Sequence, residues 1–221
     1  MAENGNCTFK TEKAPLINNF NTSEKSVKDF QIASEKNEMQ VIKAINGEIV
    51  TETFWTKVKR KDGWVVSDTE RDILKMAVVN RYENQAPAIG FINNFNLKHG
   101  AIASCVGHDS HNIIAVGVDD QSITKAVNLI IKHKGGISAV DKHSEHILAL
   151  PVAGIMTNAD GASVAAQYLE IDNIVKKQLG TQLAAPFMTL SFMALLVIPQ
   201  LKLSNLGLFD GKNFEFTPLF R

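Results

Sequence analysis

Residues 101–117, AIASCVGHDSHNIIAVG, contain two apolar runs separated by a short polar segment. The apolar runs, residues 102–106 and 113–116, consist of β-branched and small side chains bounded by polar residues and glycine, which is typical of buried strands. The polar segment, residues 107–112, is therefore expected where two strands meet, at one end of a sheet. Functional sites are common at such places, because a rigid scaffold positions the loop.

The polar segment carries side chains that can move a proton. His108 and His111 can titrate near neutral pH, and Asp109 can hold an imidazole tautomer or accept a proton. The alternative interpretation is a capped turn, whose side chains satisfy backbone groups. A His-x-x-His pair without further ligands is weak evidence for a metal, and no metal ligand is predicted here.

Further segments on both sides carry a specific likeness. They are Gly90-Phe91, residues 97–104 (LKHGAIAS), residues 150–156 (LPVAGIM) and residues 186–203 (PFMTLSF, then VIP and LKL). Together with HDSHN at 108–112, these segments resemble, in the same order, segments of the bacterial adenine deaminases of the amidohydrolase superfamily. The likeness runs from about Pro15 to the C-terminus and covers only the C-terminal part of that family.

The resemblance implies hydrolytic deamination of adenine to hypoxanthine and ammonia, a reaction of purine salvage. The position of the polar segment at a strand junction and its dense polarity motivate the hypothesis that His108, Asp109 and His111 act as catalytic residues of this reaction, by shuttling a proton or contacting adenine. Ser110 and Asn112 are then candidate substrate-binding residues. In amidohydrolases a (β/α)8 barrel holds a divalent metal (Mn, Fe or Zn), whose bound water attacks the carbon that bears the amine.

The His-x-His pair that opens such a barrel is absent from the sequence. The six histidines are His99, His108, His111, His133, His143 and His146. A barrel alone takes about 250 residues, and this chain has 221. We therefore expect an adenine deaminase C-terminal region without its metal-binding barrel, which binds no metal itself and is inactive alone. A split-gene product or a degenerate homologue fits this description, with a separate barrel polypeptide and a second copy of the chain as expected partners.

Composition excludes several other classes of function. The chain has 23 basic and 23 acidic residues, and this balance argues against a nucleic-acid or anionic-membrane surface. The basic run at 57–61 is interpreted as the solvated face of a strand. Cys7 and Cys105 are not expected to pair, which points to a reducing compartment. The N-terminus lacks the apolar core of a signal peptide, and the longest apolar tract, residues 188–199, is too short to span a bilayer, so a cytoplasmic location is expected.

The expected fold class is α/β in the α+β sense, a mixed β-sheet with two packing helices and no complete TIM barrel. Residues 1–36 are expected to form a loosely ordered, partly disordered leader. The adenine deaminase C-terminal domain then covers residues 37–221. Within it, residues 37–69 form a small β-hairpin element, the remnant of a β-sandwich, and residues 70–221 form a mixed α/β unit.

Local patterns place the elements. Asn46-Gly47 predicts a hairpin between strands at 41–45 and 49–50, and Asp62-Gly63 predicts a second hairpin that pairs 53–58 with 64–66. Further strands are predicted at 73–79, 86–92, 137–140 and 147–150. Helices are predicted from Asp119 to Gly135 and from Asn158 to Gly180, and residues 186–199 form a short apolar helix or a buried crossing. Asn94 and Asn96 stand where the similar family tends to place glycine, and asparagine tolerates a positive φ.

Two other functions stay open. The chain can be a non-catalytic binding or oligomerisation module, in which the face that a barrel would cover is an exposed apolar surface. It can also be an independent metal hydrolase that uses His108 and His111 together with His143 and His146. That reading requires the loop at 141–146, otherwise interpreted as a solvated turn, to meet the segment at 107–112.

Overall fold

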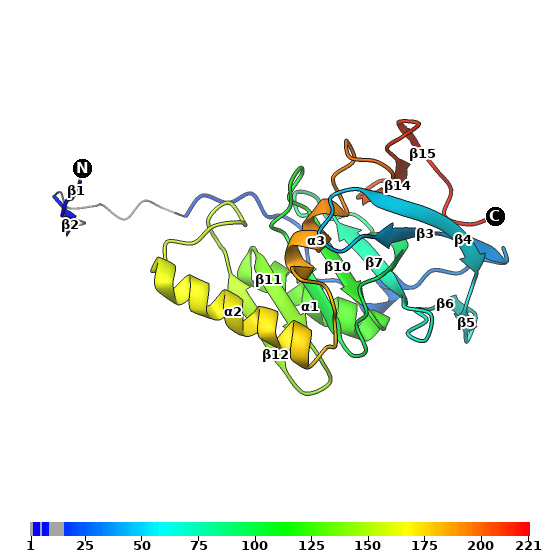
Figure 1. The fold of residues 1–221 in the computed structure, drawn as a ribbon, viewed down its shortest axis with the longest axis horizontal. Coiled ribbons are helices and arrows are strands. Elements are labelled where there is room, and N and C mark those ends of the chain that lie inside the picture. Colours follow the sequence, from blue (N-terminus) through cyan, green and yellow to red (C-terminus); the bar gives the residue numbers. More distant parts are fainter. Residues whose placement is uncertain (1, 5, 9–15) are drawn as a thin grey trace.

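The structure is a computed structural model that describes residues 2–4, 6–8 and 16–221. Its centre is an eight-stranded mixed sheet with the strand order β12-β11-β9-β10-β7-β8-β3-β4 (Figure 1). These strands are β3 (Glu38–Ala44), β4 (Thr51–Lys57), β7 (Ile73–Val79), β8 (Ala88–Asn93), β9 (Ala101–Ser104), β10 (Ile113–Gly117), β11 (Gly136–Val140) and β12 (Glu145–Ala149). Neighbouring strands are antiparallel except β3 and β8, which are parallel. The expected α+β class is confirmed, and within the described residues the sheet does not close into a barrel.

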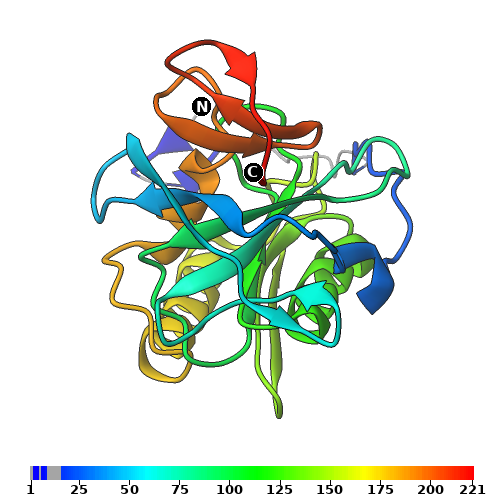
Figure 2. The same ribbon diagram turned by 90° about the vertical axis from the view of Figure 1, so that its right-hand side faces the viewer.

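Helices cover both faces of this sheet. Helix α1 (Asp120–His133) lies on one face, and α2 (Gly161–Lys177) and α3 (Pro186–Phe192) lie on the other. A three-stranded sheet of β13 (Leu201–Ser204), β14 (Gly207–Asp210) and β15 (Glu215–Phe216) completes the α3 side (Figure 2). The short elements are β1 (Ala2–Glu3), β2 (Asn6–Cys7), the 3-10 helix η1 (Val27–Phe30), β5 (Arg60–Lys61) and β6 (Trp64–Val65). The two long predicted helices are confirmed, and the segment at 186–199 begins with a short third helix.

Burial on both faces explains the nearly continuous apolar sequence of β7, ILKMAVV. Leu74, Met76 and Val78 belong to the core cluster on the α2 and α3 side. Ala77 and Val79 belong to the cluster that packs against α1. Side chains alternate between the faces of a strand, so a strand covered on both sides needs apolar residues at successive positions.

Helix α1 begins and ends as its sequence predicts. The side chain of Asp119 accepts a hydrogen bond of 2.7 Å from the Ser122 N–H at the first turn. Lys134, at φ 57°, ends the helix just before Gly135. The predicted apolar stripe is buried throughout, at Ile123, Ala126, Val127, Ile130 and Ile131.

The hairpin prediction for residues 39–66 was partly wrong. β3 pairs with β4 (Thr51–Lys57) rather than with residues 49–50. The predicted strand at 53–58 is therefore part of β4, and its partner is β3 instead of residues 64–66. Only Arg60–Lys61 and Trp64–Val65 pair across the Asp62-Gly63 turn. The start of β4 is fixed by a distant segment, because the Thr51 hydroxyl donates to the Leu201 carbonyl at 2.9 Å. β3 and β4 also belong to the main sheet, which therefore crosses the boundary expected near residue 70.

Residues 20–30 lie against the α1 face, and residues 32–36 contact the segment around β5 and β6. Phe20 and Phe30 are buried there, and the Asn128 side chain on α1 bonds both the N–H and the carbonyl of Lys25, at 2.9 and 2.8 Å. The loosely ordered leader predicted for these residues is thus corrected. Their apolar side chains fill separate gaps in another layer, so they show no period of their own. The rest of that prediction, on residues 1, 5 and 9–15, lies outside the described residues.

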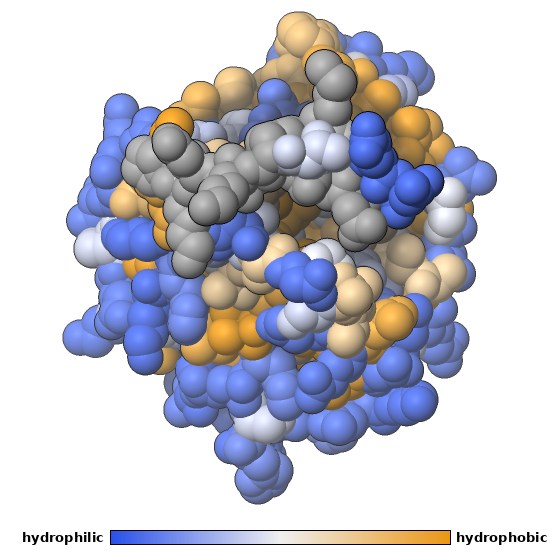
Figure 3. Space-filling view, turned by 90° about the vertical axis from the view of Figure 1, so that its left-hand side faces the viewer, coloured by the Kyte–Doolittle hydropathy of each residue, from blue (hydrophilic) through white to orange (hydrophobic). Residues whose placement is uncertain are grey.

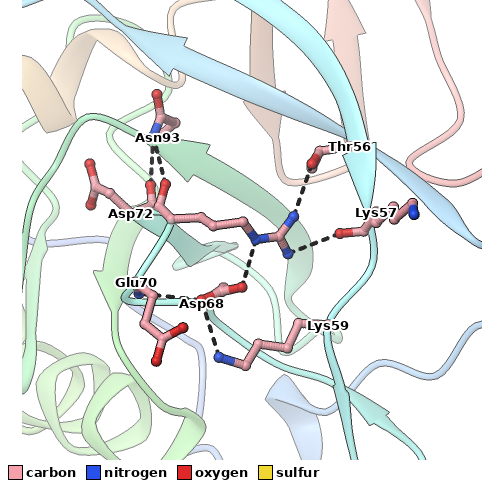
Figure 4. A network of polar contacts seen from close by, with 8 residues as sticks. Thr56, Lys57, Lys59, Asp68, Glu70, Asp72 and Asn93 are labelled. Carbon is pink, nitrogen blue, oxygen red and sulfur yellow. Dashed lines mark hydrogen bonds and ion pairs between the residues drawn. The ribbon is translucent and has the colours of Figure 1, made fainter.

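An ionic network joins β4 to the turn that precedes β7 (Figure 4). The buried Asp68 carboxylate accepts from Lys59 at 3.1 Å and from Arg71 at 2.7 Å. Arg71 also donates to the Thr56 hydroxyl, at 3.1 Å. Burial opposes ionisation of Asp68, but the hydrogen bonds from Arg71 and Lys59 outweigh it and lower the pKa of the carboxyl. The charged residues of the basic run at 57–61 are exposed, as predicted. One of its lysines, Lys59, is paired with Asp68.

Two asparagines adopt a left-handed backbone conformation in the loop after β8. Asn94 and Asn96 adopt φ of 77° and 58°, as the sequence allows. Their N–H groups donate to the Asp72 carboxylate at 2.7 and 2.8 Å. Burial raises the pKa of Asp72 in spite of these bonds. The carboxylate therefore holds the two left-handed residues in one compact loop.

Candidate functional site

Residues 107–112 form the loop of the hairpin between β9 and β10. Ser104 pairs with Ile114 at the end of the ladder, so the loop leaves the sheet at one of its ends, as predicted. The β11–β12 loop lies at the other end of β9, because Val140 pairs with Ala101. His143 and His146 are therefore separated from His108 and His111 by the length of a strand. The independent metal hydrolase that requires all four histidines is contradicted by this register.

The second half of the loop is held by Arg81 and Tyr82. The buried Asn112 side chain accepts from the Arg81 N–H at 3.2 Å. The Tyr82 hydroxyl donates to the Ser110 carbonyl at 2.7 Å, and Arg81 Nη2 donates to that hydroxyl at 2.9 Å. Asn112 thus serves the turn itself, whereas the Ser110 side chain is exposed. The capped-turn interpretation describes this half of the loop.

His108 is held from α3. Its Nδ1 lies 2.9 Å from the Ser191 hydroxyl, and its ring stacks on Phe192 with centroids 4.0 Å apart and planes at 16°. The side chain is otherwise exposed. Sequence reasoning gave no role to Ser191 or Phe192, although both stand in the PFMTLSF segment that carries the family resemblance. Only the tertiary structure brings α3 to the loop.

His111 and Asp109 occupy different environments. His111 has a left-handed backbone, φ 53°, and its Nδ1 is buried without a hydrogen-bond partner among the described residues. Burial and the nearby Arg81 guanidinium lower the pKa of His111, and the Asp109 carboxylate opposes them only in part. Asp109 itself is exposed. His111 is thus favoured as neutral imidazole, which can accept a proton.

A cavity of about 180 Å³ opens beside His108. Its wall is formed by the loop, by β9 and β11, and by side chains of α2 and α3. The residues that line it are Ser104, Val106, Gly107, His108, Ile137, Tyr168, Phe187, Met188 and Ser191. Aromatic and aliphatic walls with a few polar groups are typical of small-molecule sites.

The loop and its surroundings do not fit a metal site. Residues 2–4, 6–8 and 16–221 contain no cluster of three or more His, Cys, Asp or Glu side chains that could hold a metal ion. Catalytic zinc, for comparison, takes three protein ligands. The donor set needed for the divalent metal of amidohydrolases is thus not formed by the described side chains, and no chemical step here is assigned to a metal.

The fold and the loop together define an α+β domain that carries two histidines and an aspartate at one end of its sheet. A sequence model of the adenine deaminase C-terminal domain matches residues 48–215. The chain belongs to this family.

Relatives in other organisms agree with this assignment. The adenine deaminase of Salinibacter ruber is 42% identical over 221 residues, which are 100% of this chain and 40% of that protein. That of Sulfurovum sp. is 48% identical over 212 residues, 92% of this chain and 38% of the relative. That of Methanosarcina mazei is 46% identical over 230 residues, 99% and 41% of the two chains. The chain thus spans about 40% of the length of the relatives it matches.

The described helices are short or carry several polar residues. None of them is both long enough and apolar enough to cross a bilayer.

Proposed function

We propose that this chain is the C-terminal domain of an adenine deaminase, and that its 107–112 loop takes part in the hydrolytic deamination of adenine to hypoxanthine and ammonia. The observation that carries the proposal is the 42% identity over 100% of the chain to a protein named adenine deaminase. The metal that activates water would be held by a barrel, either in the same polypeptide or in a separate one. The proposed place of action is the cytoplasm.

The loop residues have distinct tasks in this proposal. The amine leaves as ammonia and needs a proton, which an exposed and oriented His108 can carry. Neutral His111 and the exposed Asp109 can relay that proton, because both lie within the same short loop. Ser110 offers a free hydroxyl to the substrate, and Asn112 keeps the loop in shape.

The cavity beside His108 supports the assignment of the substrate class. Tyr168 and Phe187 present aromatic rings with centroids 6.3 Å apart, and Val106 and Ile137 add aliphatic surface. Purine rings stack on aromatic side chains, and each such contact contributes about 1–3 kcal/mol. A planar, neutral base is therefore a suitable occupant.

The test reconstitutes the enzyme from two polypeptides. The purified chain is assayed for ammonia release from adenine with Mn²⁺, Fe²⁺ or Zn²⁺, alone and with the remaining 60% or so of the Sulfurovum relative expressed separately. We expect release only from the pair, and a loss of about 100-fold with His108→Asn. His143→Asn, at the opposite end of the sheet, is the matched control and should retain full activity. Turnover by the pair that is insensitive to His108→Asn would reduce the loop to a structural turn.

A second candidate function is a non-catalytic binding or oligomerisation module. Apolar side chains favour it: Met188 is 52% exposed and Val197 67% exposed. Figure 3 shows one face of the molecule on which hydrophobic atoms gather inside a frame of hydrophilic ones. Sedimentation of the purified chain separates the candidates. Self-association that Met188→Glu and Val197→Glu abolish, with no activity in the reconstituted pair, would favour the module.

A further inference from the structure

The hydroxyl of Ser191 has two neighbours and one proton. Its Oγ lies 2.7 Å from the Met188 carbonyl oxygen and 2.9 Å from His108 Nδ1. A carbonyl oxygen can only accept a hydrogen bond, so the contact with Met188 requires the serine proton. Ser191 Oγ is then an acceptor toward His108. With the serine proton on the Met188 carbonyl, a hydrogen bond at this distance assigns the hydrogen between the two side chains to His108 Nδ1, which donates it to Ser191.

The same reasoning fixes the other ring nitrogen of His108. Neutral imidazole has one N–H group, so Nε2 is an unprotonated acceptor. Nε2 makes no hydrogen bond to the residues that the structure describes, and the side chain is exposed. Uptake of a proton at Nε2 leaves the Nδ1–H bond to Ser191 intact. Proton exchange is thereby confined to one nitrogen of known orientation.

Helix α3 supplies both constraints on the ring. Ser191 is 3% exposed, and Phe192, the next residue, stacks on the imidazole. The helix is anchored in the core by Phe187 and Leu190. An exposed histidine on a hairpin loop is therefore oriented by a packed helix that is distant in sequence.

We propose that Ser191 is a positioning residue, which holds His108 in the Nδ1–H tautomer and leaves Nε2 free to exchange a proton with the substrate. The proposal deepens the proposed function and rests on it, because His108 is the proton carrier there. The tautomer itself can be measured in the isolated chain without any turnover.

The first experiment is ¹⁵N-detected NMR of the histidine rings at about pH 9, where an ordinary imidazole is neutral. We expect the Nδ1–H tautomer at His108, a shift toward Nε2–H in Ser191→Ala, and return to Nδ1–H in Ser191→Thr, which keeps the hydroxyl. Phe192→Leu removes the stack but leaves the hydrogen bond, so its tautomer should not change. The exposed His143 serves as an internal reference in every spectrum. An Nε2–H ring in the unmodified chain, or no response to Ser191→Ala in a folded variant, overturns the proposal.

The second experiment measures kcat and KM in the reconstituted pair. Ser191→Ala should lower kcat about tenfold with little change in KM, and Ser191→Thr should restore it. A rise in KM with unchanged kcat contradicts the positioning role. A loss of kcat that Ser191→Thr does not restore contradicts it as well. An Nδ1–H tautomer in a pair that does not deaminate adenine would refute the proposed function and retain the assignment of the tautomer. Deamination by a pair whose His108 is in the Nε2–H form would refute the assignment of the tautomer and retain the proposed function.

Discussion

The side chains of His108 and Ser191 lie 2.9 Å apart across 83 positions of sequence. The contact joins a hairpin loop to a short helix that packs on one face of the sheet, against the two strands that the loop connects. Because of this contact, the His108 ring has a fixed orientation, which a simple capped turn would not require. The two halves of the loop thus differ: α3 orients His108, whereas Arg81 and Tyr82 secure the segment that follows.

Tyr82→Phe tests the second half of the loop. The change removes both hydrogen bonds of the hydroxyl, to the Ser110 carbonyl at 2.7 Å and from Arg81 Nη2 at 2.9 Å, and leaves the ring over the Arg81 guanidinium. We expect a loss of about 1–3 kcal/mol in the free energy of unfolding, because each hydrogen bond contributes about 0.5–1.5 kcal/mol. Urea denaturation measures it. A loss of several kcal/mol would mean that the hydroxyl supports more than the loop.

Gly154→Ala is expected to disturb Arg81. Gly154 has φ 77°, and an added Cβ would lie 1.8 Å from Arg81 Nη1. Gly63 has a similar φ, 83°, with nothing within 4 Å of the same position, so Gly63→Ala measures the backbone strain alone. We expect about 1 kcal/mol for Gly63→Ala and at least about 3 kcal/mol for Gly154→Ala. Equal losses in thermal or urea unfolding would show that Arg81 moves aside without cost.

The sequence was sufficient for elements whose causes are local. The strand at 73–79 and the Asp119 cap of α1 each follow from neighbouring residues, whereas the left-handed asparagines at 94 and 96 were expected from the family resemblance. The PFMTLSF segment was noted as similar to the family, yet its contact with His108 was not foreseen. Helix α3 reaches the loop only through the packing of the whole α3 face, and no local period encodes that contact.

The same distinction explains the wrong predictions. Residues 49–50 look like a strand partner for β3, but the ladder starts at Thr51, which the 199–201 segment holds in place. Residues 16–36 look loosely ordered because the partners of Phe20 and Phe30 lie beyond residue 76. Contacts between distant parts of the chain decided both cases.

Lys75, which is buried, and Asp120, which is partly exposed, form an ion pair that couples β7 to the start of α1. Lys75 also donates to the Phe30 carbonyl at 3.0 Å, so the pair secures residues 16–36 as well. Burial lowers the pKa of Lys75 and raises that of Asp120, and the mutual attraction opposes both shifts. Asp120→Asn leaves a buried ammonium without its counterion, and we expect a loss of about 3–5 kcal/mol.

A double-mutant cycle checks this prediction. Lys75→Met should cost less than Asp120→Asn, because the Asp120 carboxylate that it leaves unpaired is partly exposed, whereas the Lys75 ammonium left by Asp120→Asn is fully buried. The double variant should recover part of the loss of Asp120→Asn. Additive losses in urea denaturation would show that the two charges are solvated independently.

Lys202 is a fully buried lysine whose Nζ donates to the Ile49 carbonyl at 2.8 Å. Burial lowers its pKa to about 8. The folded chain thus disfavours the charged form, whereas the unfolded chain keeps an ordinary lysine with a pKa near 10.4. Between about pH 8 and pH 10 the unfolded state binds more protons, so this group makes the folded state more stable as the pH rises. The shift corresponds to about 3 kcal/mol, an upper bound for the effect.

Lys202→Met isolates this contribution from the other groups that titrate at high pH. Methionine removes the buried ammonium and fills a similar volume, and the Ile49 carbonyl lies in a partly exposed turn where water can replace the lost donor. We expect the variant to be the more stable form at pH 7 and its advantage to shrink steadily toward pH 10. The measurement is the difference in unfolding free energy between the two proteins at each pH. A difference that stays constant, or that grows with pH, would mean that Lys202 remains charged in the folded chain throughout this range.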